Sequence, residues 1–255
     1  MIDALYIATA GLKSQQTQID TLSNNISNMQ TPGFKSQRVA FGDVAVISPE
    51  QVQSGLSPQQ SGAGSEVMST STVFSQGQMM QTNNTWDIGI QGSGFLEVVD
   101  GSGNHVYSRA GQLHVDSEGY VATVTGNRLA QSIQVPPDAT NIQIKPDGQI
   151  FATVGGDTTP TLLGAIELST FPSPEGLQSV GGNNFVATQS SGDPSVGKPN
   201  EDGVGAVLQG SLEGSNVDMV SEMSTLVIAQ RAYQLNARVL QASDQILDTI
   251  NNLRQ

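Results

Sequence analysis

The two ends of the chain have the hydrophobic spacing of amphipathic helices. Apolar residues repeat every seven positions in both segments: Leu5, Leu12, Ile19 and Ile26 in the first, with Leu22 three residues after Ile19, and Leu226, Tyr233, Leu240 and Leu247 in the second. A seven-residue apolar period is typical of helices that pack in coiled coils. The spacing predicts an N-terminal helix over residues 1–30 and a C-terminal helix over residues 215–255.

The residues between these helices have the spacing of short β-strands. Runs rich in β-branched and aromatic residues occupy positions 95–99, 105–109, 120–124, 141–144, 149–154 and 162–168. Asp-Gly and Ser-Gly clusters separate most of these runs, as expected for hairpin turns. We therefore expect an α+β protein, in which the two long helices pair as a coiled-coil core and the central β domain is mostly antiparallel.

Glycine and proline mark the same divisions. Residues 1–30 contain only Gly11 and no proline, and residues 216–255 contain neither. Residues 46–77 are mainly Gln, Ser, Gly and Thr, which taken alone is the composition of a flexible linker. The predicted order is the first helix, an extended connector with this polar segment over 31–90, a central β domain over 91–190, a return connector over 191–214, and the last helix.

Local signals place the inner ends of the helices. Pro32 and Gly33 suit the two central positions of a type II turn, in which glycine supplies the positive φ. Ser215, Asn216 and Asp218 are candidate caps for the C-terminal helix because their short side chains can accept hydrogen bonds from its first amides.

The length of the C-terminal helix bears on what it packs against. Two amphipathic helices usually pack on their own domain, and that is the simplest interpretation. A helix of this length, however, spans roughly 50 Å, which matches or exceeds the width of a small domain. We therefore expect much of it to pack outside its own β region and the ends of a lone chain to be frayed.

Composition and charge exclude several classes of function. The 255 residues include no cysteine, which excludes disulfides, thiolate nucleophiles and cysteine-ligated metals. The net charge is −13, and the ends hold 6 of the 23 acids and 4 of the 10 bases, which leaves 17 acids against 6 bases between them. This charge opposes binding to nucleic acid or to anionic membranes. The N-terminus lacks the pattern of a cleaved signal peptide, and no apolar run is long enough to cross a membrane.

Candidate catalytic and ligand-binding residues are weak. Gly92, Ser93 and Gly94 precede a strand-like run and do not continue as a dinucleotide-binding motif. His105 and His114 lie in a predicted hairpin without further metal ligands nearby. The carboxylates cluster in turns, where aspartate supports the turn itself. We expect no enzyme activity, no catalytic or metal-binding residue and no cofactor.

Four separated motifs carry a resemblance to a known family. The first, at residues 22–35, ends a helix in an asparagine cluster and a tight turn, with Asn24, Asn25, Asn28, Thr31, Pro32, Gly33 and Phe34 as its characteristic residues. The others lie at residues 76–96, 209–217 and 230–234. In this order they resemble the bacterial flagellar axial family of rod and hook proteins. Gly89, Leu96 and Gly214 depart from the pattern, where Ala, Phe and Thr would be expected.

The resemblance implies a structural subunit of the flagellar distal rod, because residues 46–77 lie where distal rod proteins carry an additional segment. It implies a rigid helical homopolymer that transmits torque and conducts exported subunits. Its neighbours would be proximal rod proteins below, hook protein above, the P and L ring proteins around it and the type III export apparatus. It further implies export without a cleaved signal peptide to a basal-body rod that spans the periplasm.

Two other readings stay open. The chain could be a proximal rod or hook-type member of the same family, because Glu-Gly-Ser-Asn at residues 213–216 also occurs in proximal rod proteins. It could also be a secreted, adhesin-like β domain, which predicts a stable monomer instead of a polymer.

Overall fold

The chain forms two compact units in the computed structural model, which describes residues 2–47, 60–155 and 159–253. The first, here called the helical unit, comprises Met1–Ser27, Gln37–Ser71 and Asp218–Gln255. The second, the β unit, comprises Asn28–Ser36 and Thr72–Val217. The chain therefore passes four times from one unit to the other.

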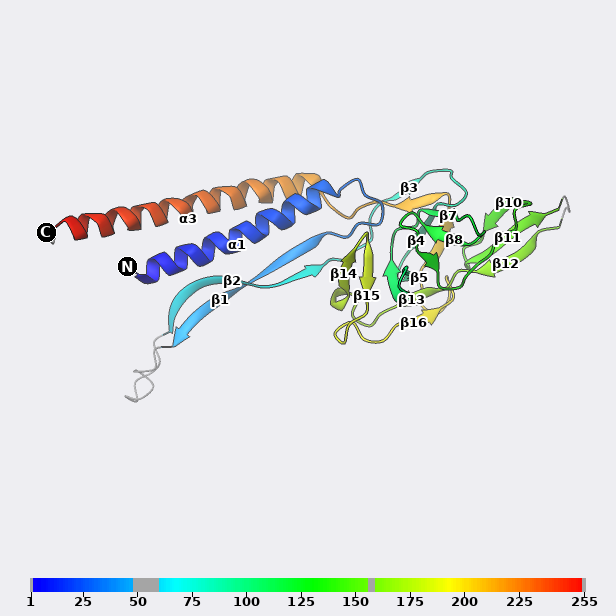
Figure 1. Ribbon diagram of the computed structural model, residues 1–255, viewed down its shortest axis with the longest axis horizontal. Coiled ribbons are helices and arrows are strands. Elements are labelled where there is room, and N and C mark those ends of the chain that lie inside the picture. Colours follow the sequence, from blue (N-terminus) through cyan, green and yellow to red (C-terminus); the bar gives the residue numbers. More distant parts are fainter. Residues whose placement is uncertain (1, 48–59, 156–158, 254–255) are drawn as a thin grey trace. The chain divides into compact units, whose positions relative to one another are not determined.

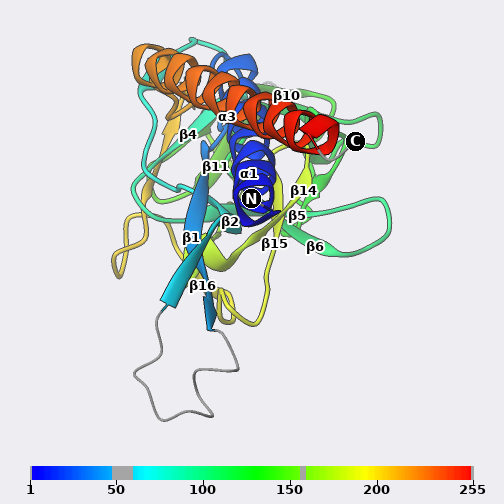
Figure 2. The ribbon, with the colours of Figure 1, turned by 90° about the vertical axis from the view of Figure 1, so that its left-hand side faces the viewer.

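The helical unit contains two long helices and a hairpin. Helix α1 (Ile2–Ser27) and helix α3 (Met219–Leu253) lie side by side and run in opposite directions (Figures 1 and 2). Of the three candidate caps, Asp218 begins α3: its Oδ1 accepts hydrogen bonds from the amides of Val220 at 2.9 Å and Ser221 at 3.3 Å. Among the described residues, neither helix is long and apolar enough to cross a membrane.

The hairpin lies in the polar part of the sequence. Strand β1 (Gln37–Ile47) pairs with strand β2 (Gln60–Thr72) as a two-stranded sheet. The composition of residues 46–77 suggested a linker, yet residues 60–72 form a strand, while 48–59 lie outside the described residues. Packing against α1 supports this strand, since the Ser14 hydroxyl, which is buried, donates to the Ser65 carbonyl at 2.9 Å.

The β unit is built on one large sheet with smaller sheets beside it. The main path runs β14-β15-β6-β5-β9-β8-β7, and β13 joins it through β5 and pairs with β16. These strands are β5 (Phe95–Val99), β6 (His105–Ser108), β7 (Leu113–Val115), β8 (Val121–Thr123), β9 (Arg128–Leu129), β13 (Leu168–Thr170), β14 (Gln178–Gly181), β15 (Asn184–Val186) and β16 (Ser195–Gly197). A 3-10 turn, η1 (Pro174–Gly176), precedes β14.

The smaller sheets complete the unit. Strands β10 (Ala139–Ile144), β11 (Gln149–Val154) and β12 (Thr161–Ala165) form a three-stranded sheet. Two further pairs join strands from the beginning and the end of the β unit: β4 (Ile88–Gln91) with β17 (Ala206–Gln209), and β3 (Met79–Gln81) with β18 (Ser211–Glu213). All of the strand pairs in the β unit with a described register are antiparallel, as the sequence predicts.

The core of the β unit is aliphatic, with a smaller aromatic cluster. Fully buried members of the main cluster include Leu96, Val98, Ile150 and Leu168. Phe95, Tyr107, Leu177 and Phe185 form the second cluster, in which Phe74 packs edge-on against Phe95 with ring centroids 5.3 Å apart. The predicted runs at 95–99, 105–109 and 149–154 supply much of this core.

Candidate assembly site

The predicted helix positions are only partly covered within one chain. Leu22 is buried. The other predicted positions are half-buried in both helices: Leu5, Leu12, Ile19 and Ile26 of α1, and Leu226 and Leu240 of α3. Tyr233 is 37 % exposed, and the side chain of Leu247 lies outside the described residues. One chain therefore leaves these positions incompletely packed, and their role in assembly remains a proposal.

Small residues bring the two helices together. Ala8 of α1 and Ala229 of α3 are 4 % and 2 % exposed, so both lie fully in the packed interior. A Cβ added at Gly11 would lie only 2.8 Å from Nδ2 of Asn236 on α3, so the absence of a side chain there permits close approach. Sequence reasoning from large aliphatic residues missed this contact, because small residues give no hydrophobic signal.

Helix α3 leaves much of its apolar surface uncovered. The large apolar side chains that are exposed along it, among the described residues, are Met219, Val220, Met223, Val227, Ile228, Tyr233, Leu235, Val239 and Ile246. Large apolar side chains exposed in this number along one helix indicate an interaction site.

The asparagine motif anchors the hairpin to α1 within the helical unit. Asn25 is 1 % exposed. Its Oδ1 accepts a hydrogen bond from the Gln37 amide at 2.9 Å, and its Nδ2 donates to the Gln37 carbonyl at 2.9 Å and to Oε2 of Glu222 at 3.4 Å. The side-chain amide thus satisfies both backbone groups of Gln37, as a neighbouring strand would. Asn24 is exposed and Asn28 is half-buried.

The predicted turn follows the motif in the β unit. The amide of Phe34 donates to the carbonyl of Thr31 at 3.2 Å, with Pro32 and Gly33 between them, and Gly33 has φ +72°. This confirms the positive φ that the sequence predicts. A Cβ at Gly33 would lie 2.7 Å from the carbonyl oxygen of Arg109, so glycine is also needed for close packing.

Beyond this turn, a buried ionic cluster joins three distant parts of the β unit. The Lys35 ammonium lies 2.6 Å from Oε1 of Glu213, and the Arg109 guanidinium lies 3.2 Å from Oε2 of the same carboxylate. Oε1 of Glu213 also accepts from the amide of Gly77 at 2.8 Å, and Lys35 donates to the Ser75 carbonyl at 2.8 Å. The three charged side chains are 0 %, 5 % and 1 % exposed for Lys35, Arg109 and Glu213.

Burial of two cations with one anion sets the electrostatics of this cluster. Desolvation lowers the pKa of Lys35, although its hydrogen bond and attraction to Glu213 act in the opposite direction. Desolvation likewise lowers the pKa of Arg109, again opposed by Glu213. Because burying a charge is costly unless it is paired, Glu213 is the group on which both cations depend.

The residues of the cluster lie close in sequence to the points at which the chain leaves or enters the β unit. Lys35 precedes the passage at residues 36–37, Ser75 and Gly77 follow the passage at 71–72, and Glu213 precedes the passage at 217–218. Asn216 adds a neutral contact, since its Oδ1 accepts from the amide of Ser36 at 2.7 Å. Sequence reasoning missed the cluster because Lys35 and Glu213 are 178 positions apart.

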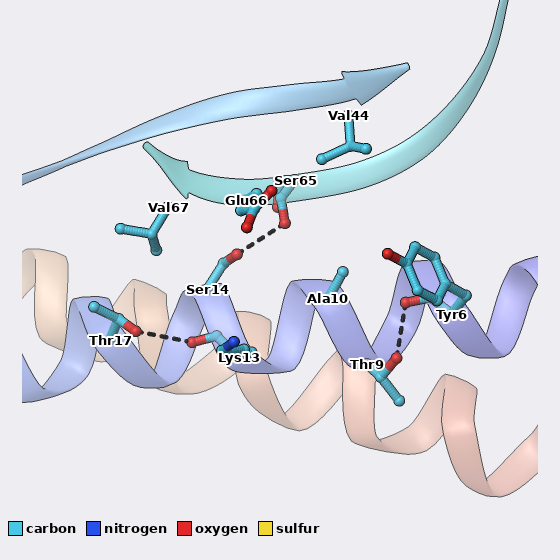
Figure 3. A pocket seen from close by; sticks show the side chains of 10 residues that line it. All are labelled: Tyr6, Thr9, Ala10, Lys13, Ser14, Thr17, Val44, Ser65, Glu66 and Val67. Carbon is cyan, nitrogen blue, oxygen red and sulfur yellow. Dashed lines mark hydrogen bonds between the residues drawn. The ribbon is translucent and has the colours of Figure 1, made fainter. Parts of the chain in front are cut away.

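A groove in the helical unit lies between α1 and the β1–β2 hairpin. It encloses about 380 Å³ and is lined by Tyr6, Thr9, Ala10, Lys13, Ser14 and Thr17 of α1 and by Val44, Ser65, Glu66 and Val67 of the hairpin (Figure 3). Its lining mixes aliphatic, hydroxyl and charged side chains.

Comparison with known families identifies the class of protein to which these features belong. Three family profiles match the chain in order: "Flagella basal body rod protein" over residues 5–35, "Flagellar hook protein FlgE/F/G D1 domain" over 89–152, and "Flagellar basal body rod FlgEFG protein C-terminal" over 208–253. The first and last cover most of α1 and α3, and the second covers much of the β unit. The paired terminal helices and central β unit are thus those of the flagellar rod and hook proteins.

Individual relatives narrow the assignment. The chain is 35 % identical over its full length to the full-length flagellar basal-body rod protein FlgG of Borreliella burgdorferi, and 35 % identical over 99 % of its length to FlgG of Caulobacter vibrioides. It is 32 % identical to the FlgG of Bacillus subtilis, with both chains fully covered. The chain belongs to the FlgG family of flagellar basal-body rod proteins. It is therefore a structural component of the rod in the flagellar basal body, and the proximal-rod, hook-type and adhesin-like alternatives are not favoured.

Proposed function

We propose that this protein is the subunit of the distal part of the rod and that it assembles into a rigid helical tube through α1 and α3. In this proposal the two helices pair as a coiled-coil core through the predicted positions Leu5, Leu12, Ile19, Leu22, Ile26, Leu226, Tyr233, Leu240 and Leu247. Copies of the chain complete the packing of those positions that one chain leaves half-buried or exposed. The function is mechanical and requires no catalytic residue or cofactor.

The observation that carries the proposal is the exposed apolar surface of α3. Fully burying one large aliphatic side chain contributes about 1.5–3 kcal/mol. Eight such side chains and Tyr233 are exposed on one helix of a single chain, and several more positions are half-buried. Contact between copies would therefore gain far more free energy than a lone chain can recover.

The buried cluster supports the mechanical part of the proposal. A shaft that transmits torque needs subunits whose parts do not shear internally. Glu213 ties Lys35, Gly77 and Arg109 together inside the β unit, close to the points at which the chain leaves it. The motif residues Asn24, Asn25, Asn28, Thr31, Pro32, Gly33 and Phe34 would serve the same end by fixing the chain after α1.

The proposed surroundings follow from the family. Proximal rod proteins would lie below this segment and hook protein above it, with the P and L ring proteins around it. The subunits would reach the periplasm-spanning rod through the type III export apparatus without a cleaved signal peptide.

Complementation of a deletion strain tests this function. We expect basal bodies from cells lacking this chain to end before the distal rod and to carry no hook, and we expect the chain supplied in trans to restore both. Electron microscopy of isolated basal bodies makes the measurement. Complete rods with hooks in the deletion strain would exclude the proposed position.

A further inference from the structure

A second apolar stripe runs along α3, separate from the predicted heptad positions. Ile228, Leu235, Val239 and Ile246 are 67 %, 59 %, 49 % and 50 % exposed. Ala232 and Ala242 fill the intervening positions, so the apolar spacing alternates between three and four residues from 228 to 246. We call these six residues the outer stripe. This spacing is that of a helix that packs against another helix.

The outer stripe lies to one side of the contact with α1. Ala229 is buried at that contact, and Asn236 lies against Gly11. At 100° per residue, the outer stripe lies roughly 90° around the helix from the row that contains Ala229 and Asn236. Within one chain, α1 therefore covers the row of α3 that contains Ala229 and Asn236, and the outer stripe stays exposed.

The groove beside α1 has the complementary spacing. Six residues of α1 line it, at positions 6, 9, 10, 13, 14 and 17, and four of them, at 6, 10, 13 and 17, are spaced by four, three and four residues. Val44 and Val67 lie over this row from the hairpin (Figure 3). Tyr6, at 62 % exposed, leaves its ring largely uncovered at the side of the groove.

Both surfaces also carry charged side chains. Glu66 lines the groove, whereas Arg231 and Arg238 flank the outer stripe on α3. Across the described residues, none of these three side chains forms an ion pair. Glu66 shares the groove with Lys13 but forms no described ion pair with it, while two arginines seven residues apart border the stripe and could pair with Glu66.

We propose that the groove between α1 and the β1–β2 hairpin of one copy receives the outer stripe of α3 from a second copy. This inference rests on the proposed rod function and specifies which two surfaces meet. Because the surfaces differ, the contact is head-to-tail and leaves a free groove and a free stripe at the two ends of every oligomer. Such a contact propagates instead of closing as a dimer.

Engineered cysteines test the contact directly, because the chain contains no cysteine of its own. Thr9→Cys places a thiol at the groove, and Leu235→Cys places one on the outer stripe. Gln234→Cys is the matched control, since it is exposed, one residue away and on a different side of α3. Two full-length single variants, one with a distinguishable tag, are mixed and oxidised, and the cross-linked species are separated on denaturing gels.

We expect the Thr9→Cys and Leu235→Cys mixture to give heterodimers on the order of tenfold more abundant than the Thr9→Cys and Gln234→Cys mixture, because docking raises the effective concentration of the two thiols. A chain with both Thr9→Cys and Leu235→Cys should give a ladder of multimers. Equal yields in the two mixtures, or Leu235→Cys dimers formed in preference to the mixed pair, would overturn the proposed contact.

Sedimentation of the parent chain separates this inference from the function on which it rests. Polymers of the parent chain without the preferred cross-link would contradict the groove contact alone. Failure of the parent chain to associate at any concentration would contradict the proposed assembly as well.

Discussion

Replacing Glu213 by glutamine should destabilise the β unit strongly, although the change is nearly isosteric. The substitution removes the only carboxylate that the described structure places against both Lys35 and Arg109. Glutamine can still accept a hydrogen bond from the amide of Gly77, so the loss is mainly that of charge. Two cations would then be buried without an anion.

The size of the expected loss in stability follows from the burial of the ion pair between Lys35 and Glu213. The side chains of Lys35 and Glu213 are 0 % and 1 % exposed, so solvent does not screen their interaction. Removing one partner of such a buried pair costs about 3–5 kcal/mol. With a urea dependence of about 2 kcal/mol per molar, the unfolding midpoint should fall by about 2 M.

Tryptophan fluorescence reports on this unit specifically. Trp86 is the only tryptophan in the chain, and it packs, partly buried, against the main hydrophobic cluster of the β unit. Urea titration of the parent and of Glu213→Gln, followed by this fluorescence, therefore measures unfolding of the β unit without a signal from the helical unit.

A surface ion pair provides the control. Glu118 lies 2.8 Å from Arg128 but is 64 % exposed, so Glu118→Gln should leave the midpoint nearly unchanged. If Glu213→Gln unfolded at the same urea concentration as the parent, the cluster would contribute no net stability and our reasoning about it would be wrong.

Three further predictions concern single positions. Gly33→Ala should lower the free energy of unfolding by about 1–3 kcal/mol, because a non-glycine residue is strained at φ +72° and its Cβ would meet the Arg109 backbone. Gly101→Ala is the control, since a Cβ there has open space, and urea titration compares the two variants. Ala229→Leu should lower the free energy of unfolding by about 1–3 kcal/mol, because it overpacks the α1–α3 contact. Loss of helical circular dichroism on heating measures the effect, and an unchanged melting curve would contradict close packing there. The pKa of Asp116 is lowered below its ordinary 3.8, first by the hydrogen bond from the Tyr120 amide, so its stabilising effect should be complete above pH 3.8 and lost as the pH falls through the lower folded value; an NMR titration midpoint at or above 3.8 would refute this.

Local patterns in the sequence predicted the local structure well. The strands at 95–99 and 149–154 and the turn at Pro32 and Gly33 depend on neighbouring residues, and the structure contains them. Asp218 caps α3 for the same reason. Hairpins, turns and caps are specified by short-range chemistry that one sequence displays.

Long-range contacts could not be predicted in this way. The sequence shows Lys35, Arg109 and Glu213 as three unrelated charges, and only the fold brings them together. Strand β2 escaped prediction because its polar residues lack the alternation of a half-buried strand, although α1 packs beside it through Ser14. The residues of the outer stripe on α3 also have helical spacing in the sequence, but the sequence analysis followed the seven-residue repeat that includes Leu226 and Leu240 and did not treat them as a separate surface.

Hydrogen exchange of α1 and α3 as a function of protein concentration tests most directly whether copies of the chain complete each other's helices. Amides in both helices should exchange quickly in dilute solution and become protected as the chain associates, while the core strands of the β unit remain protected throughout. Helices that are fully protected at every concentration, in a chain that sediments as a monomer, would contradict the account.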